Sequence, residues 1–350
     1  MVPPIDATFS GGGDRGLLRI ERSNTIPRTN NEVRHDEQGA DCADGGVGHL
    51  GLGRQRAGDG YFGSRLSESG LREVVEKAQS NGLTLWDTAV AYGMGRSETA
   101  LARALKGYHR SEYQLSTKFT PQLAGDGDDP VADMLEQSLD RLRTDYVDLF
   151  WIHNPADVAR WTPPLIPLLK SGTIKHVGVS NHNMEQIALA DRILGEAGFR
   201  VEAVQNHYSL LYRSSERAGI LDHCCKHDVR FFSYMVLEQG ALTGMYSPAN
   251  PLPEGSGRAD VYNGILPQLR ALTDRMGAIG KDRGASAADV ATAWAIAKGT
   301  TPIIGVTKAD YIDGVVRARG IELADEEIAE LEALADAADV DTRGWWEHEM

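Results

Sequence analysis

The sequence predicts an α/β fold, a (β/α)8 TIM barrel with a long loop after the seventh strand and an extra C-terminal helix. From about residue 47 onward, short apolar segments alternate with segments whose apolar residues recur at helical spacing, which is typical of a parallel sheet covered by helices. Eight strand segments follow one another in this way, and no GxGxxG motif follows the first of them. A doubly wound nucleotide-binding sheet is therefore disfavoured.

The composition of the chain is that of a globular protein. Of its 350 residues, 41% are hydrophobic and 25% are charged, and this length accommodates one barrel with additions. The 50 acidic residues exceed the 36 basic ones, which gives a formal net charge of −14. Such an excess repels nucleic acids and anionic membranes, so we expect a small molecule as the partner. The oligomeric state is left open.

The chain is expected to be cytoplasmic and to bind no metal ion. It contains no run of about 18 apolar residues, and its N-terminus lacks the pattern of a secretory signal. Its three cysteines, Cys42, Cys224 and Cys225, do not have the spacing of a metal site.

Residues 1–45 differ in composition from the rest of the chain. They are rich in Gly, Asp, Arg and Asn and show neither helical nor strand periodicity, so we interpret them as a poorly ordered or atypical N-terminal extension. Residues 46–350 are predicted to form the barrel domain. Its first strand is predicted at residues 47–53, where several glycines weaken the strand pattern.

The other strands are predicted from short apolar or alternating runs that end at polar residues. They cover residues 83–87, 113–118, 146–152, 174–179, 201–204, 230–234 and 301–304. Helices are predicted between the strands, and a loop rich in Gly and Pro at residues 238–263 suits a lid over a ligand. The helices cover residues 67–80, 97–106, 131–142, 165–170, 184–194, 216–226, 265–280, 287–297, 309–318 and 325–338.

Polar side chains stand where the predicted strands end. Because all strands of such a barrel point the same way, the residues at their ends meet at one face. The side chains expected at this face are Asp87, Lys118, His153, Ser180, Asn181, Gln205 and Tyr234. Tyr92 follows Asp87 in the same loop and is expected to face the same cavity.

Several of these residues lie in motifs that resemble those of the aldo-keto reductase family, over roughly residues 47–340. The motifs are WDTAVAYGMGRSE from Trp86, STK from Ser116, LFWIHN from Leu149, VGVSNH from Val177, VQNHYSLLYR from Val204 and LEQGALTGMY from Leu237. The resemblance implies a TIM barrel that uses NADPH to reduce aldehydes and ketones.

The resemblance also implies a catalytic tetrad, made up of Asp87, Tyr92, Lys118 and His153. Hydride addition to a carbonyl carbon produces an alkoxide, which needs a proton or a nearby positive charge. A phenol, with an ordinary pKa of about 10, keeps its proton at neutral pH yet gives it to an alkoxide. Tyr92 is therefore expected to be the general acid. Lys118 would supply the charge and Asp87 would fix Lys118, while His153 would orient the carbonyl oxygen.

The cofactor contacts are implied in the same way. The residues matched to the nicotinamide carboxamide are Ser180, Asn181 and Gln205, and the ring matched to stack on the nicotinamide is Tyr234. The residues matched to the pyrophosphate are Leu237, Gln239 and Gly240. Those matched to the adenosine phosphate are Gly305, Thr307 and Lys308.

The chain departs from the family pattern after the eighth strand. Many members carry there an Arg that clamps the 2′-phosphate of NADPH, whereas this chain has Tyr311, with Lys308 as the nearby cation. NADPH is expected as the cofactor, and NADH is possible.

Two other functions compete with a carbonyl reductase. A regulatory subunit, like the barrel subunits of potassium channels, would bind the nucleotide, turn over slowly and report redox state. A metal-dependent barrel hydrolase is disfavoured because His153 has no other ligands at metal spacing. The sequence does not say which carbonyl compound is the substrate.

Overall fold

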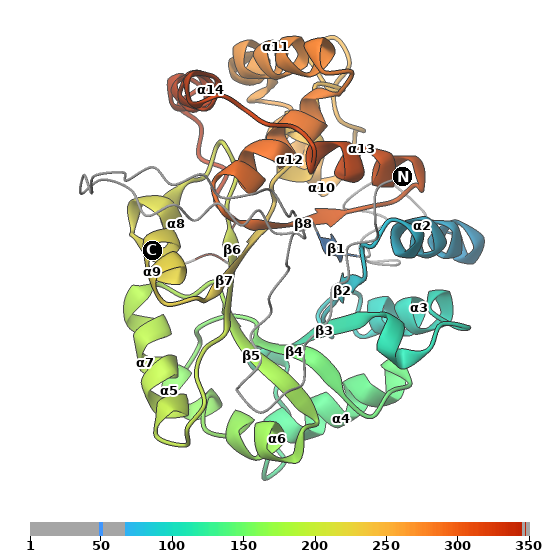
Figure 1. Cartoon of the computed structure of the whole chain (residues 1–350), viewed down its shortest axis with the longest axis vertical. Helices are drawn as coiled ribbons and strands as arrows, with labels where there is room; N and C mark the ends of the chain where they lie inside the picture. The colour runs from blue at the N-terminus through green and yellow to red at the C-terminus, as the bar shows by residue number, and fades with distance from the viewer. Residues whose placement is uncertain (1–48, 52–66, 345–346, 348–350) are drawn as a thin grey trace, which may run out of the picture.

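Eight parallel strands form a closed barrel in the order in which they occur along the chain (Figure 1). The computed structural model describes residues 49–51, 67–344 and 347. The strands are β1 (His49–Gly51), β2 (Leu85–Asp87), β3 (Gln114–Phe119), β4 (Val147–Ile152), β5 (Ile174–Ser180), β6 (Ala203–His207), β7 (Arg230–Tyr234) and β8 (Thr301–Gly305). β1 pairs with both β2 and β8, which closes the sheet. The predicted TIM-barrel fold is confirmed.

Helices surround the barrel (Figure 1). The α-helices are α2 (Glu68–Ser80), α3 (Arg96–Ala104), α4 (Pro130–Leu142), α5 (Val158–Trp161), α6 (Leu165–Ser171), α7 (Met184–Gly195), α8 (Ser214–Arg217), α9 (Ile220–Lys226), α10 (Gly257–Tyr262), α11 (Leu266–Asp282), α12 (Ala287–Ala297), α13 (Asp310–Ala318) and α14 (Asp325–Ala337). The described residues also form the 3-10 helices η1 (Arg110–Glu112), η2 (Pro121–Leu123) and η3 (Glu238–Thr243). Within the described part of the chain, no helix is both long and apolar enough to span a membrane.

The predicted extension at residues 1–45 lies outside the described residues, as do the two ends of the predicted first strand. The predicted helix over residues 216–226 is wrong in one respect. It is divided into α8 and α9, because Gly219 between them has a φ of 74°, in the left-handed region, where a helix ends.

Two further segments differ from the prediction. β6 begins at Ala203 and continues to His207, because its last residues still pair with β7. Gln205 therefore lies inside the strand and not after it. The predicted loop over residues 238–263 contains η3 and α10, and the side chain of Ser256 accepts a backbone N–H to start α10.

The interior of the barrel is filled by a small apolar cluster that includes Trp151 and Phe232. Their rings meet edge to face, with centroids 5.3 Å apart. Trp151 fits because Gly178 on the neighbouring β5 has no side chain, and a Cβ at this position would lie 2.2 Å from the indole. A second and larger cluster packs the outer face of the sheet against the helices. The barrel thus separates an inner core from an outer one, and the inner core supports the residues at the strand ends.

The contact between Gly178 and Trp151 predicts that Gly178→Ala destabilises the barrel by about 1–3 kcal/mol, because the methyl group overpacks the interior. Urea unfolding of the full chain measures this change. Gly277→Ala is a matched control, since a Cβ at this position in α11 meets nothing within 4 Å. The control is expected to be neutral or to stabilise by up to about 1 kcal/mol. Equal stability of the Gly178→Ala variant and the parent would contradict the prediction.

Candidate active site

A buried ion pair joins Asp87 at the end of β2 to Lys118 in β3. The Lys118 ammonium lies 2.5 Å from Asp87 Oδ2 and donates a second hydrogen bond to the carbonyl oxygen of Thr88, at 2.8 Å. The Lys118 side chain is fully buried and that of Asp87 nearly so. The sequence predicted this pairing, and the structure brings the two residues together.

Lys118 keeps its positive charge in this setting. Burial lowers the pKa of its ammonium, but the charge of Asp87 and the hydroxyl of Tyr92 outweigh burial, so the pKa is raised above its ordinary value. A fully buried lysine would otherwise tend to lose its proton. The site therefore contains a fixed cation that water does not screen.

The other oxygen of Asp87 is held from the barrel interior. Oδ1 accepts a hydrogen bond from Ser116 Oγ, at 2.7 Å, and lies 3.4 Å from the amide nitrogen of Gln205. Ser116 in turn accepts from the indole N–H of Trp151, at 2.5 Å. Both oxygens of Asp87 are thus engaged. This carboxylate can fix Lys118, but it is poorly placed to act as a base of its own.

Tyr92 reaches the ion pair from the turn that follows β2. The Lys118 ammonium lies 4.9 Å from the centre of the Tyr92 ring. Gly93, Met94 and Gly95, which follow Tyr92, all have a positive φ, a conformation that glycine adopts without strain. This tight turn places Tyr92 half-buried beside Lys118.

His153 completes the group that was predicted as a tetrad. It directly follows β4, and its ring meets that of Tyr92 edge to face, with centroids 5.8 Å apart. Nδ1 of His153 forms a hydrogen bond of 2.9 Å with the hydroxyl of Thr120. Asn181 donates to the backbone carbonyl of His153, at 2.9 Å. The structure therefore gathers all four predicted residues at the ends of β2, β3 and β4.

Of the residues matched to the nicotinamide, Gln205 lies within its strand and the others lie where β5 and β7 end. Ser180 ends β5, Asn181 follows it with a φ of 63°, and Gln205 lies in β6. Tyr234 ends β7, and its hydroxyl donates to the amide oxygen of Asn181, at 2.6 Å. These side chains line the rim beside His153, as the strand order of the barrel requires.

The segment after β7 has an unusual backbone. Glu238, Gln239 and Gly240 have φ values of 44°, 53° and 108°, so three consecutive residues adopt the left-handed conformation. Leu237 directly precedes them. Arg258 of α10 donates to the carbonyl oxygen of Gln239, at 3.2 Å, and its buried Nε has no partner among the described residues. Sequence reasoning missed Arg258, because an arginine in a loop rich in Gly and Pro gives no periodic signal.

The residues matched to the adenosine phosphate are at the end of β8. Gly305 is the last residue of that strand, Thr307 is half-buried and Lys308 is exposed. The Lys308 ammonium lies 5.9 Å from the centre of the Tyr311 ring. Tyr311 is itself exposed, so this end of the candidate site is open and weakly charged.

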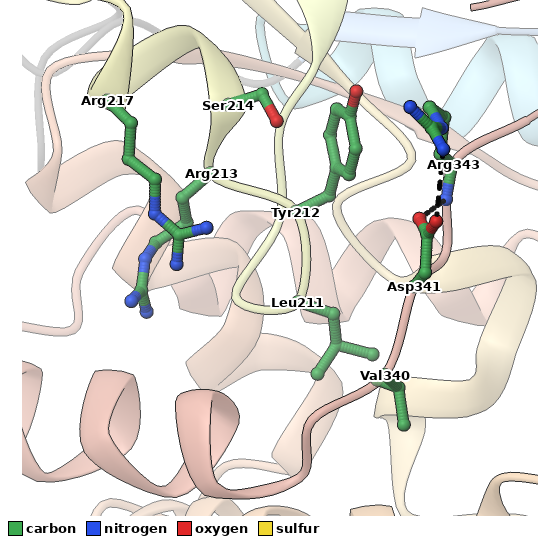
Figure 2. A pocket seen from close by; sticks show the side chains of 8 residues that line it. All are labelled: Leu211, Tyr212, Arg213, Ser214, Arg217, Val340, Asp341 and Arg343. Atoms are coloured by element: carbon green, nitrogen blue, oxygen red, sulfur yellow. Dashed lines mark hydrogen bonds and ion pairs between the residues drawn. The ribbon is translucent and has the colours of Figure 1, made fainter. Parts of the chain in front are cut away.

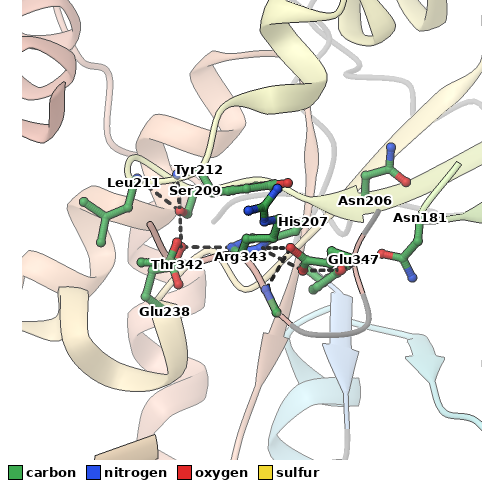
Figure 3. A network of polar contacts seen from close by, with 12 residues as sticks. Asn181, Asn206, His207, Ser209, Leu211, Tyr212, Glu238, Thr342, Arg343 and Glu347 are labelled. Carbon is green, nitrogen blue, oxygen red and sulfur yellow. Dashed lines mark hydrogen bonds and ion pairs between the residues drawn. The ribbon is translucent and has the colours of Figure 1, made fainter. Parts of the chain in front are cut away.

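A buried polar network borders the predicted nicotinamide residues, and sequence reasoning did not find it (Figure 3). His207 at the end of β6 lies between two carboxylates, with Nε2 at 2.9 Å from Glu238 and Nδ1 at 2.9 Å from Glu347. Glu347 lies 2.8 Å from the Tyr234 hydroxyl, as an alternative acceptor to Asn181. Glu238 further accepts from the hydroxyl of Tyr262, at 2.7 Å.

His207 is positively charged within this network. Burial lowers the pKa of the imidazole, but Glu238 and Glu347 outweigh burial and raise it to about 9. Both ring nitrogens then carry protons and donate to carboxylates. His207 also stacks on Tyr234, with ring centroids 5.5 Å apart. The network therefore holds the positive charge of His207 against the ring of Tyr234, which is predicted to meet the nicotinamide.

A cavity of about 410 Å³ lies beside this network (Figure 2). Its lining includes Tyr212, which stacks on His207 with centroids 4.3 Å apart, and Arg343 of the C-terminal segment. Arg213 and Arg217 also line it, and both form ion pairs with Asp336. The cavity borders the network through Tyr212 and contains none of the four residues predicted as the tetrad.

Comparisons with known proteins agree with this geometry. The model of the aldo/keto reductase family matches residues 49–336. A chloroplastic pyridoxal reductase of Arabidopsis thaliana is 31% identical over 76% of this chain and 76% of its own length. An uncharacterized oxidoreductase of Mycobacterium bovis is 31% identical over 84% of this chain and 90% of its own.

Two solved structures are similar as well. A glycerol dehydrogenase from Gluconobacter oxydans gives a TM-score of 0.69 at 25% identity, over 82% of this chain and 90% of its own. An aldo-keto reductase from Klebsiella pneumoniae in complex with NADPH gives a TM-score of 0.63 at 25% identity, over 83% and 89% of the two chains.

The raised pKa of His207 predicts a pH dependence of stability. An imidazolium with a folded-state pKa of about 9 stabilises the fold fully below pH 6.5, and this contribution is lost as the pH rises through about 9. The loss amounts to roughly 3 kcal/mol. Urea unfolding of the parent and of His207→Gln between pH 6 and 10 measures it, because the variant lacks this group. Parallel pH profiles of the two proteins would contradict the assignment.

Proposed function

The chain belongs to the aldo/keto reductase family, and we propose that this oxidoreductase reduces the carbonyl group of an aldehyde or ketone, with Tyr92 as the general acid. One observation carries the proposal. The buried ammonium of Lys118 contacts both Asp87 and Tyr92. A fixed cation beside a phenol favours release of the phenolic proton to an alkoxide.

A nicotinamide dinucleotide fits the residues at the strand ends. Arg258 offers a buried N–H without an acceptor among the described residues, next to the left-handed backbone of Gln239 and Gly240. Guanidinium groups and backbone N–H groups are the donors that suit a pyrophosphate. The related structure from Klebsiella pneumoniae contains NADPH, which supports the same cofactor here. When bound, NADPH would supply the hydride.

Residues of the chain would donate the proton to the carbonyl oxygen and stabilise the negative charge that results. Tyr92 would donate its proton to the oxygen of the reduced carbonyl, and Lys118 would stabilise the phenolate that remains. Asp87 would keep Lys118 in place through the 2.5 Å contact. Since the Lys118 side chain is fully buried, water would screen this charge less than it screens a charge at the surface.

His153 would orient the carbonyl group. The hydrogen bond between its Nδ1 and Thr120 fixes the ring, and we assign Nε2 to the carbonyl oxygen. The rings of His153 and Tyr92 lie with their centroids 5.8 Å apart, so one carbonyl oxygen between them would be within reach of both side chains. The carbonyl would then face the acid and the orienting group together.

Oxidation of NADPH or NADH by the full chain, with a panel of small aldehydes and diketones, tests the function. The panel includes pyridoxal, and glycerol is tested in the reverse direction with NADP⁺, because these compounds appear in the names of a relative and a structural neighbour. Carbonyl-dependent oxidation of the cofactor is the expected result. Absence of turnover with every compound and both cofactors would contradict the proposal.

Tyr92→Phe is expected to lower kcat by at least about 100-fold, because the general acid is lost while the ring remains. Cofactor affinity should change little. Tyr108→Phe is the control, since Tyr108 precedes β3 and so lies at the opposite end of the barrel from the strand ends. Steady-state kinetics with one substrate of the panel compare the variants. An unchanged kcat for Tyr92→Phe would remove Tyr92 from this role.

Lys308→Ala is expected to weaken NADPH binding by about 3- to 10-fold and to leave NADH binding unchanged, because only NADPH carries a 2′-phosphate. The effect is modest because Lys308 is exposed and water screens its charge. Isothermal titration gives both dissociation constants. Lys281→Ala, an exposed lysine of α11, is the control. An equal loss of affinity for the two cofactors would place Lys308 away from the 2′-phosphate.

A further inference from the structure

The C-terminal segment brings one carboxylate back to the mouth of the barrel. After α14, Thr342 donates a hydrogen bond to Glu238, at 3.1 Å. Two hydrogen bonds join Gly344 and Glu347: the Glu347 N–H donates to the Gly344 carbonyl at 3.0 Å, and the Gly344 N–H donates to Glu347 Oε2 at 3.1 Å. The Glu347 side chain is fully buried. Its position is therefore defined by hydrogen bonds to Gly344 as well as to His207.

The Tyr234 hydroxyl has one proton and, among the described residues, two acceptors. Asn181 Oδ1 lies 2.6 Å from it and Glu347 Oε1 lies 2.8 Å from it. A hydroxyl donates to one acceptor at a time, and a carboxylate is the stronger acceptor. When the hydroxyl no longer donates to Asn181, it can donate to the charged carboxylate of Glu347 instead.

The amide of Asn181 is already engaged in the structure. Its nitrogen donates to the carbonyl oxygen of His153, at 2.9 Å, and to Ser180 Oγ, at 3.2 Å. The His153 carbonyl can only accept, so the nitrogen must face it and the oxygen must face Tyr234. The amide oxygen is therefore the part of Asn181 that an incoming N–H group would meet, and the Tyr234 hydroxyl competes for it.

We propose that Glu347 is a positioning residue for the nicotinamide cofactor. It accepts the hydrogen bond of the Tyr234 hydroxyl, which leaves the Asn181 amide oxygen available to accept from the nicotinamide carboxamide. This inference rests on the proposed function, which brings the carboxamide to Asn181. Without Glu347, the Tyr234 hydroxyl would keep its hydrogen bond to Asn181 and compete with the carboxamide for the amide oxygen, which weakens binding. His207 keeps Glu347 in place for this exchange through its own N–H bond.

The exchange predicts a loss of affinity that depends on the carboxamide N–H. Glu347→Ala is expected to weaken the binding of NADP⁺ by about 3- to 10-fold. The 3-acetylpyridine analogue of NADP⁺ has a methyl ketone in place of the carboxamide and donates no N–H, so its affinity should change by less than about 2-fold. Isothermal titration with the full chain measures both. Glu347→Gln keeps a neutral acceptor of the same shape and should fall between the parent and Glu347→Ala.

Asp339→Asn is the matched control. Asp339 is exposed on the same segment and has a φ of 47°, a conformation that asparagine also tolerates. It should leave both affinities unchanged.

Equal weakening of NADP⁺ and the analogue by Glu347→Ala would show general disturbance of the site and overturn the inference. Unchanged affinity would overturn it too, and tighter binding would mean that Glu347 competes with the cofactor. Failure of the parent itself to bind NADP⁺ or NAD⁺ would instead overturn the proposed function, and the inference with it.

Discussion

The candidate site depends on the buried ion pair between Asp87 and Lys118. Removing two charges from water costs several kcal/mol for each ion, and the pair persists only because other groups satisfy both partners. Ser116 and Gln205 donate hydrogen bonds to Asp87, while the Thr88 carbonyl accepts one from Lys118. This requirement reaches into the barrel, because Ser116 is held by Trp151. The inner core therefore supports the charge arrangement as well as the fold.

Two buried cations lie at the same rim although the chain as a whole is acidic. Lys118 and His207 are both held charged by carboxylates, with Asp87 on one and with Glu238 and Glu347 on the other. The net charge of −14 therefore says little about the field inside the site. Local pairing in a place that water does not reach decides that field.

The sequence was sufficient for the barrel and for much of its rim. Strand ends are recognised from short apolar runs, and the barrel geometry then brings residues such as Asp87, Lys118 and His153 to one face. The sequence was insufficient for contacts that no periodic pattern encodes. Glu347 reaches His207 across 140 positions of the chain, and Arg258 reaches Gln239 from a short helix inside a predicted loop. Gly219 divides a helix, because a single left-handed residue outweighs the helical periodicity around it.

The pairing of β1 with β8 has a consequence for the order of folding. Every other strand pair joins neighbours along the sequence, whereas this pair joins the two ends of the barrel. Closing such a long loop has a large entropic cost, so contacts of high sequence separation tend to form late. Gly51 pairs with Gly305, which is matched to the adenosine phosphate. A ligand held there would bind preferentially to the closed chain and so draw the last folding step toward completion.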